Sequence, residues 1–332
     1  MSLRAGHFLC LKAYNPMTSS AETLPIRGTR AWVFAGQGSQ VPGMGEDIYK
    51  AFPQTQRIFE SAAAGFDLKE LCFNASAELL GDTRYTQASM AAFAAAVVMV
   101  LRDNGIDCDA ALGLSLGEYN ALFAADVLES ETLLELLGFR GAIMADASSF
   151  PSTMTAVFGL EDEVVEETVR EARELAGKGV FCTNYNCPGQ LVIGGEADTV
   201  LVAEELLKAR GARRCIALKT SGPFHTPFMA EAATKLAERL APLSFKAQRV
   251  PVIFNVTASP APDSEIKDLL IAQMVSPVRF AQSIQTLESA GIKTIVEIGP
   301  GHVLAGLIKK TSPGMSVVSI ETAEDLRKVI EA

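Results

Sequence analysis

Long hydrophobic runs and positive charge are both scarce in this chain of 332 residues. Its longest apolar run, Met90 to Leu101, has 12 residues. Such a run is too short to span a bilayer, so it predicts a buried helix, and no membrane partner is expected. The net charge of −10 also argues against nucleic acid as a partner, because phosphate backbones are bound by clustered cations.

Cysteine and histidine are also sparse. The six cysteines lack the rhythm of a disulfide framework, and no secretory signal precedes them, which favours the cytoplasm. Cys182 and Cys187 have no second Cys or His pair nearby, so no metal site is expected. Residues 1–28 show no clear periodicity and predict a loosely ordered extension, with a targeting peptide as the less favoured alternative.

What the chain does contain is apolar sequence, 48% hydrophobic against 20% charged residues, enough to fill a core. Short apolar runs that predict buried strands alternate with longer helical patterns, as in an α/β sheet. The predicted strands cover residues 30–36, 108–115, 250–256 and 293–299. The predicted helices cover about 54–65, 87–104, 117–126, 129–145, 228–241, 278–290 and 302–310.

Residues 150–219 follow a different pattern, with strands and helices in the order βαββαβ. This order is typical of a ferredoxin-like domain. The sequence therefore predicts a large hydrolase-like α/β domain with a parallel sheet, formed by residues 29–149 and 220–332. A small ferredoxin-like domain, residues 150–219, is inserted into it.

Ser115 stands between two glycines, in Gly113-Leu114-Ser115-Leu116-Gly117, where a predicted strand becomes a helix. Small residues at this junction allow a sharp turn that exposes one side chain, which is a way to present a nucleophile. In the alternative interpretation, Ser115 only caps the helix.

A serine nucleophile needs a base, and the chain has three histidines. His7 lies in the N-terminal extension, and His302 begins a predicted helix where capping is expected. His225 lies in the Pro- and Gly-rich segment TSGPFHTPFM. We therefore predict that His225 is the base, with a structural loop histidine as the alternative.

An oxyanion hole needs two donors, and the N–H of Leu116, directly after the nucleophile, is the expected first donor. The N–H of Gln37, in the loop after the first strand, is the preferred second. The glycines of this loop could also indicate a nucleotide site, but Val41 stands where the third glycine of a dinucleotide motif belongs and no Gly-Lys-Ser/Thr follows. No nucleotide cofactor is expected.

Seven segments occur in a fixed order: FAGQGSQ, GLSLGEY, FRGAIM, NYNCPGQLVIGG, SGPFHTPFM, SPVRF and EIGPGHVL. Together they resemble the malonyl-CoA:acyl carrier protein transacylases, the acyltransferase family of fatty-acid and polyketide synthesis. The resemblance covers about residues 29–310. It implies that Ser115 is acylated, that His225 is its base, and that the main-chain carbonyl of Gln273 orients the imidazole. Asn255 is a weaker candidate for orienting it.

The resemblance also implies three substrate-binding residues. Arg140 binds the free carboxylate of the malonyl group, Gln87 lines the pocket, and Phe224 favours malonyl over methylmalonyl. A guanidinium can bind a carboxylate through two parallel hydrogen bonds, which gives Arg140 a physical reason to distinguish malonyl from acetyl. In the alternative, Arg140 forms a salt bridge on a helix face.

The activity implied is transfer of malonyl from malonyl-CoA to the phosphopantetheine thiol of an acyl carrier protein, through a malonyl-serine. Coenzyme A thioester is then a substrate, no cofactor is required, and the expected enzyme is a cytoplasmic monomer that meets its carrier in trans. A basic patch would dock the acidic carrier, and its candidates are Arg213, Arg214, Lys219, Lys309 and Lys310.

One departure from the family pattern is Leu114, which stands where the family usually has histidine. It leaves open a non-catalytic module with an acyltransferase shape. The other alternative is a serine thioesterase or hydrolase that uses the same Ser115 and His225.

Overall fold

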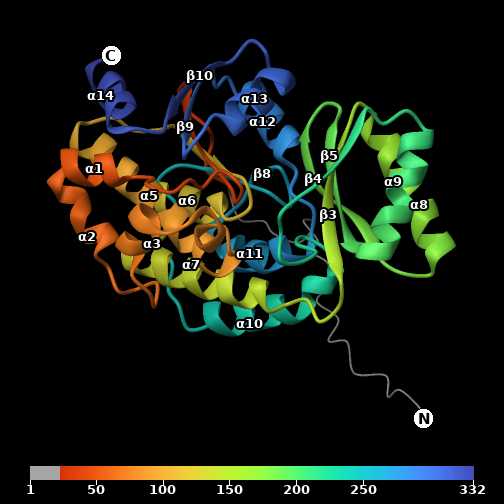
Figure 1. The fold of residues 1–332 in the computed structure, drawn as a ribbon. Coiled ribbons are helices and arrows are strands. Elements are labelled where there is room, and N and C mark those ends of the chain that lie inside the picture. Colours follow the sequence, from red (N-terminus) through yellow and green to blue (C-terminus); the bar gives the residue numbers. More distant parts are fainter. Residues whose placement is uncertain (1–22) are drawn as a thin grey trace.

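The computed structural model describes residues 23–332. Residues 1–22, most of the predicted extension, lie outside the described residues. The six residues 23–28 that complete the predicted extension form no helix or strand and are mostly exposed. From Arg30 onward the chain forms two sheets with helices packed around them (Figure 1).

The larger sheet has six strands in the order β10-β9-β1-β2-β7-β8. All neighbouring strands pair in parallel except β7 and β8, which are antiparallel. The predicted α/β class with a mostly parallel sheet is therefore confirmed. Its strands are β1 (Arg30–Phe34), β2 (Ala110–Gly113), β7 (Val252–Phe254), β8 (Ser259–Pro260), β9 (Thr294–Ile298) and β10 (Ser316–Ile320).

Helices and short turns of 3-10 helix (η) connect these strands. Central strands such as β1 and β2 read as continuous apolar runs because helices cover both faces of a parallel sheet. The helical elements are α1 (Glu46–Ala51), η1 (Pro53–Thr55), α2 (Gln56–Phe59), α3 (Leu68–Asn74), α4 (Ala77–Leu80), α5 (Thr83–Asp103), α6 (Gly117–Ala124), α7 (Ser130–Ala145), η2 (Pro227–Met229), α10 (Ala230–Leu240), η3 (Asp263–Glu265), α11 (Ile266–Val275), α12 (Phe280–Ser289), α13 (Val303–Thr311) and α14 (Ala323–Glu331).

The smaller sheet is antiparallel, with strands in the order β4-β5-β3-β6. Two helices cover its outer face, on the right of Figure 1. Chain order is β3 (Ser152–Phe158), α8 (Asp162–Ala176), β4 (Val180–Cys187), β5 (Gln190–Glu196), α9 (Ala197–Ala209) and β6 (Arg214–Ala217). This is the predicted βαββαβ order, and every element lies within residues 150–219; that this segment is a separate inserted domain stays a prediction.

Strand β4 joins the small sheet to the rest of the protein. The N–H of Tyr185 donates to the carbonyl of Val278 at 2.9 Å, and the N–H of Val278 donates to the carbonyl of Thr183 at 2.9 Å. Val278 precedes α12, which follows the large domain's α11. The small sheet is therefore joined to the segment before α12 by main-chain hydrogen bonds as well as by its two chain connections.

Helix α5 is the buried helix that the apolar run predicts, but it is longer than that run because it begins at Thr83. Its 21 residues are long and apolar enough to cross a membrane by length and composition, yet 83% of the apolar window is buried inside the protein. In this structure the helix packs against α6 and α7 as part of the core.

The predicted helix over 54–65 is wrong in extent. Only η1 and the four residues of α2 are helical there, and a turn follows in which Gly65 has φ +83°. The Asp67 side chain then accepts the N–H of Glu70 at 2.9 Å and starts α3. The alanine-rich sequence favours one continuous helix here. The glycine with a positive φ and the capping carboxylate instead end one helix and begin the next.

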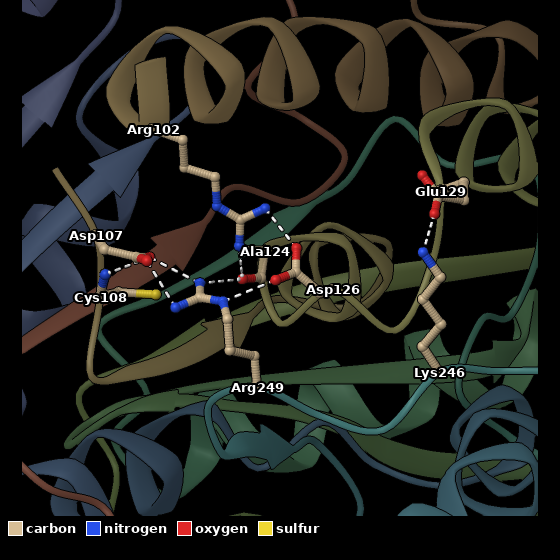
Figure 2. A network of polar contacts seen from close by, with 8 residues as sticks. All are labelled: Arg102, Asp107, Cys108, Ala124, Asp126, Glu129, Lys246 and Arg249. Carbon is tan, nitrogen blue, oxygen red and sulfur yellow. Dashed lines mark hydrogen bonds and ion pairs between the residues drawn. The ribbon is translucent and has the colours of Figure 1, made fainter. Parts of the chain in front are cut away.

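An ionic network fixes the end of the sheet where β2 begins (Figure 2). Arg249 forms ion pairs with Asp107 at 2.6 Å and Asp126 at 2.7 Å, and Arg102 pairs with Asp126 at 2.7 Å. Both arginines also donate to the carbonyl of Ala124. The network thus holds together the ends of α5 and α6 and the segments before β2 and β7.

Candidate active site

Ser115 lies at a sharp turn between β2 and α6, with φ 55°. A Cβ at Gly113 would lie 1.9 Å from the carbonyl carbon of Gly117, and one at Gly117 would lie 2.4 Å from the carbonyl oxygen of Phe34. Only glycine fits such contacts, so the two glycines allow the chain to turn closely enough to hold Ser115 in a left-handed conformation.

The structure brings His225 to Ser115 across 110 positions of sequence, with 2.7 Å between Nε2 and Oγ. His225 Nδ1 lies 2.8 Å from the main-chain oxygen of Gln273. A carbonyl can only accept, so Nδ1 carries the hydrogen and Nε2 presents its lone pair to the serine. His225, like Ser115, has a positive φ, 61°, so both residues of this pair have backbone conformations that non-glycine residues rarely adopt.

His225 is neutral at physiological pH in this environment. Its side chain is buried, and burial together with the nearby positive charge of Arg140 lowers the pKa of His225 to about 4, against the raising effect of the Gln273 carbonyl. A neutral imidazole whose Nε2 faces a hydroxyl can take the hydroxyl proton.

The sequence predicts that two main-chain N–H groups form the oxyanion hole: that of Leu116, directly after Ser115, and that of Gln37, in the loop after the strand next to β2. Leu116 precedes the first turn of α6, and Gln37 follows β1, which pairs with β2. Within residues 23–332 no hydrogen bond uses either N–H. The Gln37 side chain is occupied separately, since its Nε2 donates to Thr83 Oγ1 at 2.8 Å.

Arg140, on α7, is fully buried. Nη1 donates to Gln87 Oε1 at 2.7 Å, Nη2 donates to Gln273 Oε1 at 2.8 Å, and Nη2 lies 3.4 Å from Ser115 Oγ. In the described part of the chain Arg140 forms no ion pair, so the helix-face salt bridge considered for it is not observed. A buried guanidinium whose hydrogen-bond acceptors are neutral, beside the Ser115 hydroxyl, can receive a carboxylate.

Gln273 and Gln87 have side-chain roles that sequence reasoning did not find. The Gln273 amide connects three parts of the site, because Oε1 accepts from Arg140 and Nε2 donates to the carbonyl of Ser115 at 3.1 Å, while its main-chain carbonyl contacts His225. Gln87 is buried against Arg140 and Met144, and its amide oxygen accepts a hydrogen bond from the guanidinium of Arg140.

In residues 23–332 Asn255 forms no hydrogen bond to the imidazole, which corrects the suggestion that it orients His225. Its Oδ1 accepts the N–H of Ser115 at 2.8 Å, and its Nδ2 donates to the carbonyl of Gly113 at 2.7 Å. Asn255 therefore braces the turn that carries the serine. It directly follows strand β7, the neighbour of β2, which explains why it reaches the serine turn.

Two further positions complete the description. Phe224 is 6% exposed, and its role beside the acyl group remains a prediction. Leu114 has an apolar side chain that approaches Gly36, where an added Cβ would lie 2.6 Å from Leu114 Cδ2. It packs beneath the loop that bears Gln37 and supplies no polar contact there.

Glu118 is a buried acid that sequence reasoning overlooked. It lies in the first turn of α6, fully buried, and its Oε2 accepts the N–H of Asn255 at 2.5 Å. A carboxylate three residues after the serine, in the first turn of a helix that is mostly buried, was the available signal. No cluster of three or more His, Cys, Asp or Glu residues suited to a metal ion occurs in residues 23–332.

Comparison with known proteins gives consistent results. Residues 31–326 match the family described as acyl transferase domain. The chain is 39% identical over 305 residues to the malonyl CoA-acyl carrier protein transacylase of Bacillus subtilis, covering 91% of this chain and 96% of that one.

Solved structures agree. An acyl carrier protein S-malonyltransferase from Vibrio cholerae has a TM-score of 0.87 and 36% identity, and the match covers 91% of this chain and 100% of that one. A type II polyketide-synthase acyl carrier protein has been solved in complex with its malonyl-transacylase. The matched chain of that structure has a TM-score of 0.87 and 34% identity, over 92% of this chain and 99% of its own.

Proposed function

Because this chain belongs to the acyl transferase domain family, we propose that it transfers the malonyl group from malonyl-CoA to the phosphopantetheine thiol of an acyl carrier protein. The names of the relatives over almost the whole chain support this activity. The reaction exchanges one thioester for another, so it requires no cofactor. The free state of the five cysteines in residues 23–332 fits a cytoplasmic enzyme.

The acylation half of the reaction begins at the Ser115–His225 pair. Nε2 of His225 takes the proton of Ser115 as Oγ forms a bond to the thioester carbon. The N–H groups of Leu116 and Gln37 hold the oxyanion. The C–S bond then breaks, coenzyme A leaves with the proton from His225, and malonyl remains on Ser115. The carrier thiol reverses these steps, with His225 as base and Ser115 as the leaving group.

The observation that supports malonyl as the acyl group is Arg140. Its buried guanidinium lies at 3.4 Å from Ser115 Oγ, and a malonyl group on that oxygen carries its free carboxylate toward the same charge. A charged hydrogen bond contributes about 1.5–3 kcal/mol, so acetyl, which lacks the carboxylate, loses about one to two powers of ten for each such bond. Phe224 would exclude the extra methyl of methylmalonyl.

The carrier is proposed to dock on a basic patch. Arg213, Arg214, Lys219, Lys309 and Lys310 are all exposed, so their positive charges are accessible to an acidic carrier. The solved complex of a related transacylase with its carrier supports docking of a separate carrier protein, and we propose that this enzyme acts as a monomer on a carrier in trans.

The experiment that tests the proposed function is competition among malonyl-, methylmalonyl- and acetyl-CoA for transfer to a carrier protein, with wild type and Arg140→Ala. Wild type is expected to prefer malonyl, and the variant to lose that preference and gain relative acetyl transfer. An unchanged preference would remove Arg140 from the site. Release of free malonate with no malonyl-carrier would favour the hydrolase alternative, and the absence of any acyl-serine would favour the non-catalytic module.

A further inference from the structure

Glu118 is a fully buried carboxyl group that the mechanism above does not use. Its Oε2 accepts the N–H of Asn255, whereas its Oε1 has no hydrogen-bond partner among residues 23–332. A buried carboxylate without full compensation is costly, so its charge state must depend on its neighbours.

The neighbouring charge is Arg140, the group proposed to bind the malonyl carboxylate. Glu118 and Arg140 are both fully buried on helices that pack against each other, and the Arg140 guanidinium lies 5.4 Å from the ring centroid of Tyr119, the residue after Glu118. The charge of Arg140 lowers the pKa of Glu118, and no hydrogen bond joins the two side chains in residues 23–332. Nε of Arg140 likewise has no partner in the described part of the chain. Glu118 and an incoming malonyl carboxylate would therefore compete for the same positive charge.

No other charged side chain near Glu118 can take over this role. Helix α6 packs against α5, α7, β1, β2 and β7. Strands β2 and β7 contain no titratable residue, and Arg30 of β1 is exposed. On α5, Arg84 pairs with Asp146, Arg102 pairs with Asp126, and Asp103 is exposed. Tyr85, also on α5, is partly buried and packs edge-on against Phe66.

The remaining titratable groups are few. On α7, apart from Arg140, Glu131 is exposed and Glu135 pairs with Arg239. On α6 itself, Tyr119 is buried with a pKa raised to about 12 by burial, so it stays neutral. His225 is neutral above a pKa of about 4.

We propose that Glu118 is a specificity-determining residue that must be protonated for Arg140 to bind the malonyl carboxylate. The inference rests on the proposed function. When Glu118 is neutral, Arg140 has an uncompensated buried charge that attracts the malonyl group. When Glu118 is ionised, it already balances Arg140, and a second carboxylate would leave a net negative charge in the buried site. Malonyl binding then requires one proton from solvent, which the unpartnered Oε1 can carry.

The electrostatic environment puts this exchange in an accessible pH range. Burial raises the pKa of Glu118 to about 8, against the lowering effects of the Asn255 N–H and of the Arg140 charge. Below that pH the empty site holds mostly the neutral acid, and above it mostly the carboxylate. Malonyl affinity is therefore expected to be high at neutral pH and to fall as the pH rises through about 8.

The test is the KM of malonyl-CoA for formation of acyl-Ser115, measured from about pH 6 to about pH 10 with acetyl-CoA as the reference substrate. Both thioesters carry the same coenzyme, so its ionisations cancel in the ratio. For wild type, the ratio of malonyl to acetyl KM should rise by up to about tenfold per pH unit above the pKa of Glu118. In Glu118→Gln the ratio should be flat, because an amide oxygen can still accept from Asn255 but cannot ionise.

Glu297→Gln is the matched control. Glu297 is also a buried carboxylate, 1% exposed, but it accepts the N–H groups of Leu304 and Ala305 at the start of α13. This variant should keep the wild-type profile. A flat ratio in wild type, or the same rise in Glu118→Gln as in wild type, would overturn the proposal while leaving malonyl transfer intact.

Proton uptake by the wild type keeps the proposal testable if Glu118→Gln does not fold. Malonylation above the pKa of Glu118, in weak buffer with an indicator dye and corrected for ionisation of free coenzyme A, should take up close to one proton per malonyl-serine. No uptake would overturn the proposal. A wild type that forms no malonyl-serine at any pH would instead overturn the proposed function, and this inference with it.

Discussion

At the scale of single residues, Gln273 contacts more residues of the candidate site than its place in the sequence suggests. Its main-chain oxygen contacts His225 Nδ1, and its side chain contacts both Arg140, the proposed carboxylate ligand, and the main-chain carbonyl of Ser115. The neutral amide suits this position, because it holds the guanidinium without cancelling its charge. A charged partner would hold Arg140 as firmly but would compete with the substrate.

Two substitutions of Gln273 separate these effects. Gln273→Leu leaves the main-chain carbonyl for His225 but removes the side-chain partners of Arg140 and Ser115. Each unpaired buried group costs about 1–3 kcal/mol, so kcat/KM for malonyl-CoA should fall by about 10- to 100-fold. Gln273→Glu should lower malonyl transfer more than acetyl transfer, because the new carboxylate occupies Arg140.

Steady-state kinetics with both thioesters would measure these changes. A Gln273→Leu enzyme with wild-type kcat/KM would show that the side chain only fills space. Equal losses of malonyl and acetyl transfer in Gln273→Glu would contradict the electrostatic role assigned to Arg140.

At the scale of elements, the strand–turn–helix unit β2-Ser115-α6 depends on two glycines that have no room for a side chain. Gly113→Ala would place Cβ 1.9 Å from the main chain of Gly117. The backbone must shift to relieve that contact, so we expect a loss of stability above about 3 kcal/mol. Gly306→Ala in α13 is the control, because nothing lies within 4 Å of its added Cβ.

Urea denaturation of both variants gives the comparison. Gly306→Ala should be neutral or more stable by up to about 1 kcal/mol, since alanine favours a helix interior. If Gly113→Ala were as stable as Gly306→Ala, the turn would not have the tight geometry described.

The ionic network around Arg249 allows a second comparison of elements (Figure 2). Arg249 pairs with two carboxylates while its side chain is 37% exposed, whereas Lys246 and Glu129 form one pair with both side chains 64% exposed. Exposed single pairs contribute little, and charges held in a network contribute more. Arg249→Gln should therefore lower the unfolding free energy by about 1–2 kcal/mol, and Lys246→Gln by less than about 0.5 kcal/mol.

Thermal unfolding at low and high salt measures this difference. The loss in Arg249→Gln should shrink at high salt because salt screens partly exposed charges. Equal effects of the two substitutions would mean that the network adds nothing to a single surface pair.

At the scale of the whole molecule, alternation of short apolar runs with helical patterns was enough to predict the α/β class. The βαββαβ order of residues 150–219 could also be predicted from the sequence. Helix boundaries were predicted less accurately. The stretch Ala62–Ala64 favours a helix by composition, but Gly65 and the Asp67 cap decide otherwise. Helix α11, which carries Gln273, was not predicted as a helix.

Site residues could be predicted where chemistry leaves few candidates in the sequence. They could not be predicted where their contacts depend on residues far away in the chain. Glycine spacing indicated Ser115, and the scarcity of histidine indicated His225. Nothing local showed that Glu118 would meet Asn255, 137 positions away, or that Asn255 would brace the serine turn. Such contacts depend on which strands are neighbours, and β2 and β7 pair only in the folded sheet.

The most direct test of the account is the mass of the intact protein, and of its Ser115 peptide, after brief exposure to malonyl-CoA and then to a holo-carrier protein. We predict one malonyl group on Ser115, its absence in Ser115→Ala, much slower labelling in His225→Ala, and transfer of the group to the carrier. No label on wild type, a label on another residue, or loss of the group to water with the carrier unmodified would contradict it.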